Sequence, residues 1–212
     1  MSLTLVIGNK NYSSWSLRAW LALELAQVPY EEILVSLYGP QSRQRLLQHS
    51  PTGKVPVLKT EDGVIWDSLA IAEYLAERFP EAHLWPRGQA ARALARSACA
   101  EMHSGFVALR SHMPMDLRRS QALAEVPAEV QADIARVCAL WLECRQRHGR
   151  DGDFLFGHAS IADAFFAPVA ARLRSYRVAL PQEAQAYVDS IYQWPAFQRW
   201  YQAGLQETEN NG

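Results

Sequence analysis

The sequence predicts two unequal domains, an α/β domain followed by an all-helical one. Strand-like and helix-like hydrophobic patterns alternate over the first eighty residues, which is typical of an α/β unit. After Pro80 and Pro86 the strand patterns stop, and Ala, Leu, Glu, Gln and Arg dominate. At 212 residues the chain can form two domains that each bury a core. We therefore expect domains at 1–80 and 87–212, joined by a linker at 81–86.

The first domain should have the element order βαβαββα. Leu3–Ile7 is an apolar run of strand length, and leucines recur at helical spacing from Leu17 to Leu25, before Pro29. A strand-helix-strand crossover joins parallel strands, whereas the turn Glu61-Asp62-Gly63 joins antiparallel ones, so the four-stranded sheet is mixed and thioredoxin-like. The other expected elements are strands at Glu32–Ser36, Val55–Lys59 and Val64–Trp66, and helices at Ser42–His49 and Ser68–Phe79.

The second domain should contain only helices. The longest is expected to run without a break over Gly88–His112 and to end at Met113-Pro114-Met115. Ser160 and Asp163 have the spacing of a capping box at the start of a later helix. The segment Glu207–Gly212 is expected to be a frayed tail. The other predicted helices are Pro127–Gly149, Ser160–Arg174, Gln182–Tyr192 and Pro195–Gly204.

Composition argues against several classes of partner. The formal net charge is −1, with acidic and basic residues interspersed, so nucleic acid and acidic membrane surfaces are not expected as partners. The three cysteines form no Cys-x-x-Cys pair, which favours a reducing, cytoplasmic location. Neither a secretory leader nor a run of about 18 apolar residues is visible. Cys99 and His103 are four residues apart, but no further ligands occur at zinc-like spacing, so no metal site is expected.

Two short motifs in the first domain predict a site for an extended peptide that bears a carboxylate. Val55-Pro56 lies where proline would spoil a strand, so it should begin the strand at a turn, plausibly with a cis bond. That turn would leave the Val55 N–H and C=O free to pair with a ligand. Asp67 and Ser68 open the next helix, whose first N–H groups and positive dipole end favour a carboxylate.

The polar loop Asn11-Tyr-Ser-Ser-Trp-Ser16 precedes the first helix and could support thiol chemistry. A serine hydroxyl is too weak an acid to be a useful base here, but it can donate a hydrogen bond to a bound thiolate and so favour the ionised sulfur. The simpler alternative is that Ser13, Ser14 or Ser16 only caps the helix.

These motifs, in this order and spacing, resemble those of the cytosolic glutathione S-transferase family over nearly the whole chain. The resemblance implies the GST fold, an enzyme of detoxification, glutathione as co-substrate, and a homodimer. The matching segments are the serine loop, Ser50-Pro-Thr-Gly-Lys-Val-Pro-Val-Leu58, Asp67-Ser-Leu-Ala-Ile-Ala-Glu-Tyr-Leu75 and Ser160-Ile-Ala-Asp-Ala164.

The resemblance also implies roles for individual residues. Lys54, Val55 and Pro56 would hold the cysteinyl part of glutathione, and Asp67 with Ser68 would hold its γ-glutamyl end. Ser13 or Ser14 would bond the sulfur, and we expect Ser13 to matter more. The second substrate, expected to be a small, apolar electrophile, would contact the residues facing the thiol across the cleft. These are Trp15, His103, Phe106, Arg110 and Met113, the last four predicted on one face of the long helix, with Arg174 as another basic member of the cleft wall.

Within the family, the Ser-Ser-x-Ser pattern is most similar to the zeta class, which includes maleylacetoacetate isomerases. Two departures bear on activity: Trp15 stands where zeta enzymes have Cys, and the helix after the capping box has Arg174-Ser175-Tyr176 where they place Arg directly before an aromatic residue. The main prediction is therefore a serine-type transferase that attacks an electrophile with the glutathione thiol. The alternatives are a glutathione-dependent isomerase and a non-catalytic binding module of the same fold.

Overall fold

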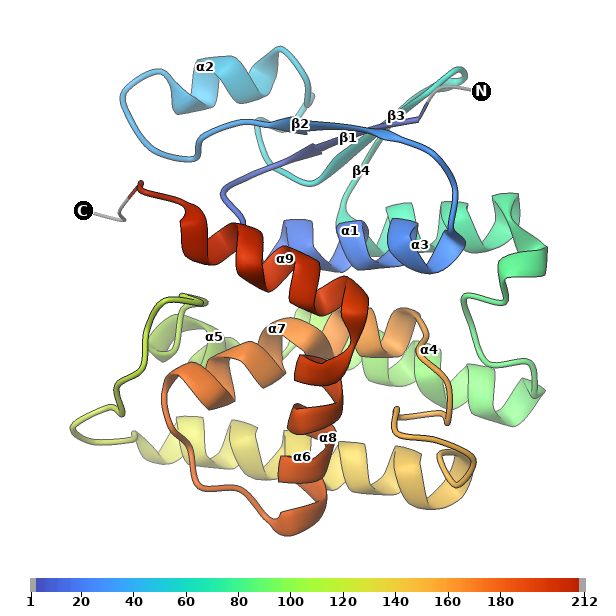
Figure 1. The fold of residues 1–212 in the computed structure, drawn as a ribbon, viewed down its shortest axis with the longest axis vertical. Coiled ribbons are helices and arrows are strands. Elements are labelled where there is room, and N and C mark those ends of the chain that lie inside the picture. The colour runs from blue at the N-terminus through green and yellow to red at the C-terminus, as the bar shows by residue number, and fades with distance from the viewer. Residues whose placement is uncertain (1–2, 210–212) are drawn as a thin grey trace.

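The structure, a computed structural model, describes residues 3–209 and contains a four-stranded sheet at its amino-terminal end (Figure 1). The strand order is β2-β1-β3-β4; β1 and β2 are parallel, and the other two pairs are antiparallel. The prediction of a mixed four-stranded sheet is therefore confirmed. The elements are β1 (Thr4–Ile7), α1 (Ser14–Ala26), β2 (Glu31–Leu34), α2 (Ser42–Leu47), β3 (Val57–Thr60), β4 (Gly63–Trp66) and α3 (Ser68–Arg78).

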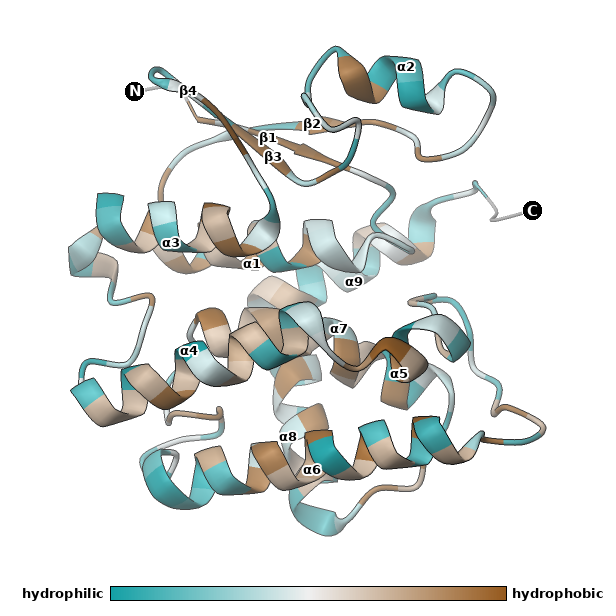
Figure 2. Cartoon of the chain, turned by 180° about the vertical axis from the view of Figure 1, so that it is seen from behind, coloured by the Kyte–Doolittle hydropathy of each residue, from teal (hydrophilic) through white to brown (hydrophobic). Residues whose placement is uncertain are grey.

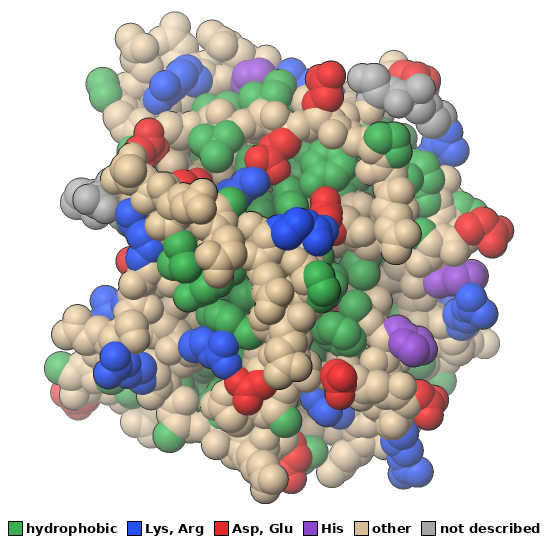
Figure 3. Space-filling model, in the orientation of Figure 1, with side chains coloured by type: hydrophobic (Ala, Val, Ile, Leu, Met, Phe, Trp, Pro, Cys, Tyr) green, Lys and Arg blue, Asp and Glu red, His purple; other side chains and the backbone are tan. Residues whose placement is uncertain are grey.

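A helical domain follows, as predicted, and lies beyond α1 and α3 on one side of the sheet (Figure 1). Within the described residues, no helix is both long enough and apolar enough to cross a membrane. Charged side chains of both signs are interspersed over the face shown in Figure 3. The elements are the short 3₁₀ helix η1 (Pro80–Ala82), α4 (Gln89–Ser104), α5 (Val107–His112), α6 (Ala128–His148), α7 (Ile161–Ser175), α8 (Gln182–Gln193) and α9 (Pro195–Gln206).

β1 lies between two apolar clusters, one on each face of the sheet. This explains why it is coloured as hydrophobic along most of its length in Figure 2. Leu5 and Ile7 belong to the large core shared with the helices. Val6 points to the opposite face, because successive side chains in a strand alternate, and packs in a small cluster with Val57 and with Leu46 of α2.

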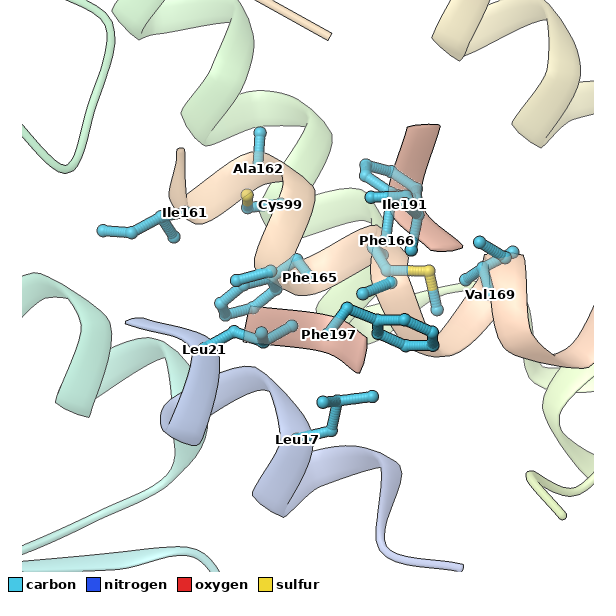
Figure 4. Packing of buried hydrophobic residues seen from close by; sticks show 14 of the residues in the cluster. Leu17, Leu21, Cys99, Ile161, Ala162, Phe165, Phe166, Val169, Ile191 and Phe197 are labelled. Carbon is cyan, nitrogen blue, oxygen red and sulfur yellow. The ribbon is translucent and has the colours of Figure 1, made fainter. Parts of the chain in front are cut away.

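Helix α1 is buried on nearly all sides, between the sheet and the helical domain. It packs against α3 on one flank and against α7 of the helical domain. Leu17 and Leu21 of α1 lie close to Phe165 of α7 and Phe197 of α9 (Figure 4). One continuous core therefore extends through both parts of the molecule.

The predicted single helix over Gly88–His112 is wrong, since the chain breaks between α4 and α5. Gly105 ends α4, and Phe106 takes the left-handed conformation with φ of 54°. A Cβ at position 105 would lie 2.7 Å from the Glu101 carbonyl oxygen, so the close approach at the end of α4 requires glycine. Phe106 is 7% exposed and packs in the core. The packing of Phe106 in the core therefore accompanies a break in the helix, although the spacing of the apolar residues predicts that the helix continues.

The predicted capping box at the start of α7 is confirmed, and its carboxylate does more than cap. Asp163 Oδ2 accepts a hydrogen bond from the Ser160 N–H at 2.9 Å. Its Oδ1 accepts bonds from the Leu155 N–H at 3.1 Å and from the Tyr187 hydroxyl at 3.0 Å. Burial raises the pKa of Asp163 to about 6, although these bonds favour its ionised form. Asp163 thus joins α7, α8 and the loop before α7.

We predict that Asp163→Ala lowers the free energy of unfolding by about 3 kcal/mol, because four buried donors, the Ser160 hydroxyl among them, lose their acceptor. Urea denaturation of the purified protein measures this. Asp189→Ala is the control: it removes an exposed ion pair with Arg174 and should cost less than about 1 kcal/mol. Equal losses in the two variants would contradict a structural role for the Asp163 network.

Candidate functional site

A cavity of about 410 Å³ lies where the turn before β3, the start of α3 and the first turn of α1 meet. Its volume is within the range of small-molecule sites. The cavity brings together six residues that the sequence placed in the site, although they are widely spaced in the chain. The lining residues are Trp15, Thr52, Lys54, Val55, Pro56, Trp66, Asp67 and Ser68.

The backbone of Val55 is available to a ligand at the wall of this cavity. The Val55-Pro56 peptide bond is cis, and β3 begins only at Val57. Among residues 3–209, the N–H and C=O of Val55 form no hydrogen bond. Because nearly all buried backbone groups in folded proteins are paired, two free groups beside a cavity indicate an edge that an extended ligand can pair with.

The start of α3 offers polar groups to the same cavity. Asp67 has φ of 76°, which residues other than glycine rarely adopt, and its Oδ1 accepts a hydrogen bond from the Leu69 N–H at 2.8 Å. The Ser68 hydroxyl is buried and has no hydrogen-bond partner within the part of the chain that the structure describes. An unpaired buried hydroxyl costs free energy, so a ligand group that bonds it would remove that cost.

His103 of α4 links the helical domain to this polar corner. Its Nε2 lies 3.2 Å from Asp67 Oδ2, and its ring packs edge-on to Trp15 with centroids 5.1 Å apart. Burial lowers the pKa of His103, and the Asp67 carboxylate partly opposes that effect. His103 therefore reaches the cavity from the helical domain, and its place opposite a thiol stays a prediction.

The serine loop divides into a structural part and a part that faces the helical domain. The Ser13 hydroxyl donates to Ser16 Oγ at 2.7 Å and accepts from the Ser16 N–H, so it acts as the cap of α1. The Ser14 hydroxyl oxygen accepts a bond of 3.1 Å from Arg172 Nη2. Both serines are 6% exposed, and neither is among the residues that line the cavity. Trp15, which follows Ser14, does line it.

Two arginines that the sequence patterns did not single out are buried next to this loop. Arg18 is 1% exposed, its guanidinium carbon lies 4.3 Å from the Trp15 ring centroid, and its Nε and Nη1 have no partner among the described residues. Burial lowers the pKa of Arg18 to about 9 and that of Arg172 to about 10, so both remain charged at neutral pH. Each arginine interrupts an apolar helix, and this was the signal available in the sequence.

The remaining predicted pocket residues separate into two groups. Arg110 lies over the Trp15 ring at 5.6 Å, on the cleft side. Phe106 and Met113 are instead buried in the core, because the break after α4 turns them inward. Placing Arg174 in the cleft wall was wrong: it pairs with Asp189 of α8 at 2.5 Å and lies over Tyr192. Residues 172 and 174 point to different faces of α7.

The predicted fraying of the terminal segment is also wrong for Glu207–Glu209, which hold the loop between β1 and α1; positions 210–212 lie outside the described residues. The Glu207 carboxylate accepts bonds from the Lys10 N–H at 2.6 Å and the Asn11 N–H at 3.0 Å. Glu209 accepts from the Asn9 side chain at 2.7 Å. The helical domain therefore fixes the loop from its far side. Hydrophobic patterning could not reveal these contacts because they are polar and lie about 200 residues apart.

Within residues 3–209, no group of three or more His, Cys, Asp or Glu side chains is placed to hold a metal ion. The cavity instead combines a free backbone edge, a helix start and a hydroxyl. These are the elements that bind a peptide with a carboxylate.

Comparison with known proteins agrees with this geometry. Residues 12–78 match the glutathione S-transferase N-terminal domain, and residues 89–203 match the glutathione S-transferase C-terminal domain. Glutathione S-transferase Z1 of Arabidopsis thaliana is 30% identical over 203 residues, which cover 89% of this chain and 89% of that protein. A probable maleylacetoacetate isomerase of Caenorhabditis elegans is 37% identical over 99 residues, and the match spans 47% of this chain and 46% of that protein.

Among solved structures, a glutathione transferase homologue from Burkholderia, with bound glutathione, has the same fold. The TM-score is 0.71 at 24% identity, and the alignment covers 96% of this chain and 98% of that one. The chain belongs to the glutathione S-transferase family, which confirms the sequence-based identification of a glutathione transferase with glutathione as co-substrate and zeta-type proteins among its relatives.

Proposed function

We propose that the cavity binds glutathione, with Val55 pairing to its cysteinyl backbone and Asp67 and Ser68 holding its γ-glutamyl end. The observation that carries this proposal is the meeting of the unpaired Val55 backbone with the unpaired Ser68 hydroxyl in one cavity. Lys54 and Pro56 complete the same wall. The ammonium group of the γ-glutamyl end suits the Asp67 carboxylate, and its carboxylate suits the start of α3.

Ser14 is the better candidate for the bond to the sulfur, because the Ser13 hydroxyl is occupied in both directions by Ser16. Ser14 accepts from Arg172, and among the described residues its own proton has no acceptor. A thiolate at the cavity could take that proton as a hydrogen bond. This reverses the order of importance that the sequence suggested for the two serines.

The activated sulfur would attack an electrophilic carbon held against Trp15, with His103 and Arg110 beside it. The new bond joins sulfur to carbon, the electrons displaced at that carbon leave with its leaving group or move along its double bond, and the thiol proton goes to solvent. An apolar electrophile fits the indole wall. Isomerisation, in which glutathione is regenerated, is the second candidate because of the similarity to a probable maleylacetoacetate isomerase. Free-thiol accounting during turnover separates the two, since only conjugation consumes thiol.

A second copy of the chain would cover the outer surface of β4 and α3. Val64 is 41% exposed and Trp66 is 48% exposed on this edge strand. They border an open, mostly apolar depression of about 640 Å³ that continues from the glutathione cavity through Trp66 and Asp67. Exposed apolar surface on an edge strand is typical of an interface.

The free cysteines suit a reducing, cytoplasmic location for this homodimer.

We predict that the thiol of bound glutathione has a pKa at least about one unit below that of the free peptide, since a hydroxyl donor and nearby cations favour thiolate. Ultraviolet titration of the thiolate on the protein measures it. Ser14→Ala should raise this pKa toward the value of free glutathione. Ser13→Ala should mainly lower stability, by about 1 kcal/mol as expected for a helix cap. A thiol pKa unchanged by Ser14→Ala would remove Ser14 from the mechanism.

Ser68→Ala should weaken glutathione binding about 10-fold or more, because a hydrogen bond to a charged group is lost far from the sulfur. The rate at saturating glutathione should stay within about threefold of the wild type. Calorimetry and steady-state kinetics test both expectations, with the exposed Ser97→Ala of α4 as the matched control. A collapse of the saturated rate with unchanged affinity would place Ser68 at the thiol instead.

Sedimentation velocity tests the proposed dimer. Val64→Glu should convert the dimer to monomer, because it places charge in the apolar surface without touching the residues that line the glutathione cavity. Leu142→Glu, at an exposed position of α6, should leave the dimer intact. A monomeric wild-type protein would overturn the assignment of this surface.

A further inference from the structure

Arg172 is a buried cation for which the fold gives no charged partner. It is 4% exposed, and its Nε and Nη1 donate to the carbonyl oxygens of Met113 at 2.8 Å and Pro168 at 3.1 Å. Within residues 3–209, no carboxylate lies in ion-pair distance of it. Because buried charges are normally paired, an arginine held only by neutral acceptors needs an explanation.

The third bond of Arg172 crosses from the helical domain to the thiol loop. Its Nη2 donates to the Ser14 hydroxyl oxygen at 3.1 Å. Because arginine has donors only, Ser14 must act as the acceptor in this contact. The Ser14 proton is therefore directed away from Arg172. The two carbonyl bonds fix the guanidinium plane, so the direction of the third bond is fixed as well.

We propose that Arg172 is a positioning residue for thiol activation. It holds the Ser14 hydroxyl so that this group donates toward the sulfur of glutathione, and it places a positive charge next to that hydroxyl. The inference rests on the proposed function, because it assigns Arg172 a role in the same site. It also explains why the uncompensated charge is kept: the glutathione thiolate supplies the missing negative charge when it is bound. Arg172 does not touch the substrate in this assignment.

Other charged and titratable groups act on the same place, so the role of Arg172 has to be separated from theirs. Arg110 of α5 and Tyr176 at the end of α7 interact electrostatically with Arg172. Arg18 of α1 adds a second buried cation, and His103 and Asp67 form a pair on the other side of Trp15. Among the described residues, only Arg172 donates a hydrogen bond to the Ser14 hydroxyl. A test must therefore separate the effect of the Arg172–Ser14 hydrogen bond from the effect of the positive charge.

The experiment compares Arg172→Met, Arg172→Lys, Ser14→Ala and the double variant Arg172→Met/Ser14→Ala with the wild-type protein. The control is Arg174→Met, two residues along the same helix, whose side chain pairs with Asp189 outside the site. Three quantities are measured: calorimetric affinity for glutathione, the pKa of the bound thiol by ultraviolet titration, and kcat with KM toward a standard aromatic halide electrophile as probe. A melting temperature for each variant monitors folding.

We expect Arg172→Met to raise the pKa of the bound thiol by about one unit. At pH values below that pKa, kcat should fall about 10-fold, while the affinity for glutathione changes less than about threefold. Arg172→Lys should recover part of the pKa shift because it keeps the charge. In the double variant, the loss of kcat should be smaller than the product of the two single losses, since both act on one hydroxyl. Arg174→Met should leave the thiol pKa unchanged.

Three results would overturn the inference. An unchanged thiol pKa in Arg172→Met would do so, as would losses that multiply in the double variant. If Arg172→Met does not fold, Arg172→Lys decides: a folded lysine variant with a wild-type thiol pKa and a wild-type pH profile would show that the Arg172 geometry is not needed. Failure of the wild-type protein to bind glutathione is a different outcome, which overturns the proposed function and the inference together.

Discussion

The burial of α1 between the sheet and the helical domain is the constraint on which the rest of the molecule depends. Its residues from Leu17 to Leu23 are almost completely enclosed, by α3 on one side and α7 on another. A helix this deeply buried gains its stability from packing rather than from an amphipathic pattern. Its first turn is consequently held in position by both parts of the chain. The geometry of the site at that turn thus depends on the packing between the two parts.

This burial explains why polar contacts around the start of α1 are so specific. The loop before α1 cannot be solvated freely, so its backbone donors need protein acceptors, and Glu207 supplies two of them. The Asn11 side chain accepts from the Leu117 N–H and donates to Asp116, which ties the loop to the segment after α5. Forming such contacts costs little additional conformational entropy, because each element is already fixed by the core. They fix the loop that carries the serines.

The sequence was sufficient to predict the mixed sheet, the order of elements in the first domain, and six of the eight residues that line the cavity beside Val55. These depend on local periodicity, on proline and on helix starts, which leave clear patterns in the chain. The break at Gly105 was missed because Phe106 fits the helical spacing as well as it fits the core. Arg172 and the terminal Glu207 were missed for another reason: Arg172 contacts Ser14, and Glu207 contacts Lys10, across more than 150 residues of sequence, and a polar contact at that distance has no periodic signature. Position in the fold, rather than residue type, decides their roles.

Charged groups from both domains meet at this site. The helical domain contributes the buried Arg172 together with Arg110, and the thioredoxin-like domain contributes the Asp67 carboxylate, which His103 reaches from the other side. Glutathione carries groups of both signs, with an ammonium at one end and a thiol that can become negative. In the proposed complex, its ammonium would lie near Asp67 and its sulfur near Ser14. Under the proposed function, the donor Ser14 belongs to the first domain and the arginine that holds it, Arg172, belongs to α7, so a substitution of Arg172 would change the acidity of the thiol while the residues that line the cavity stay in place.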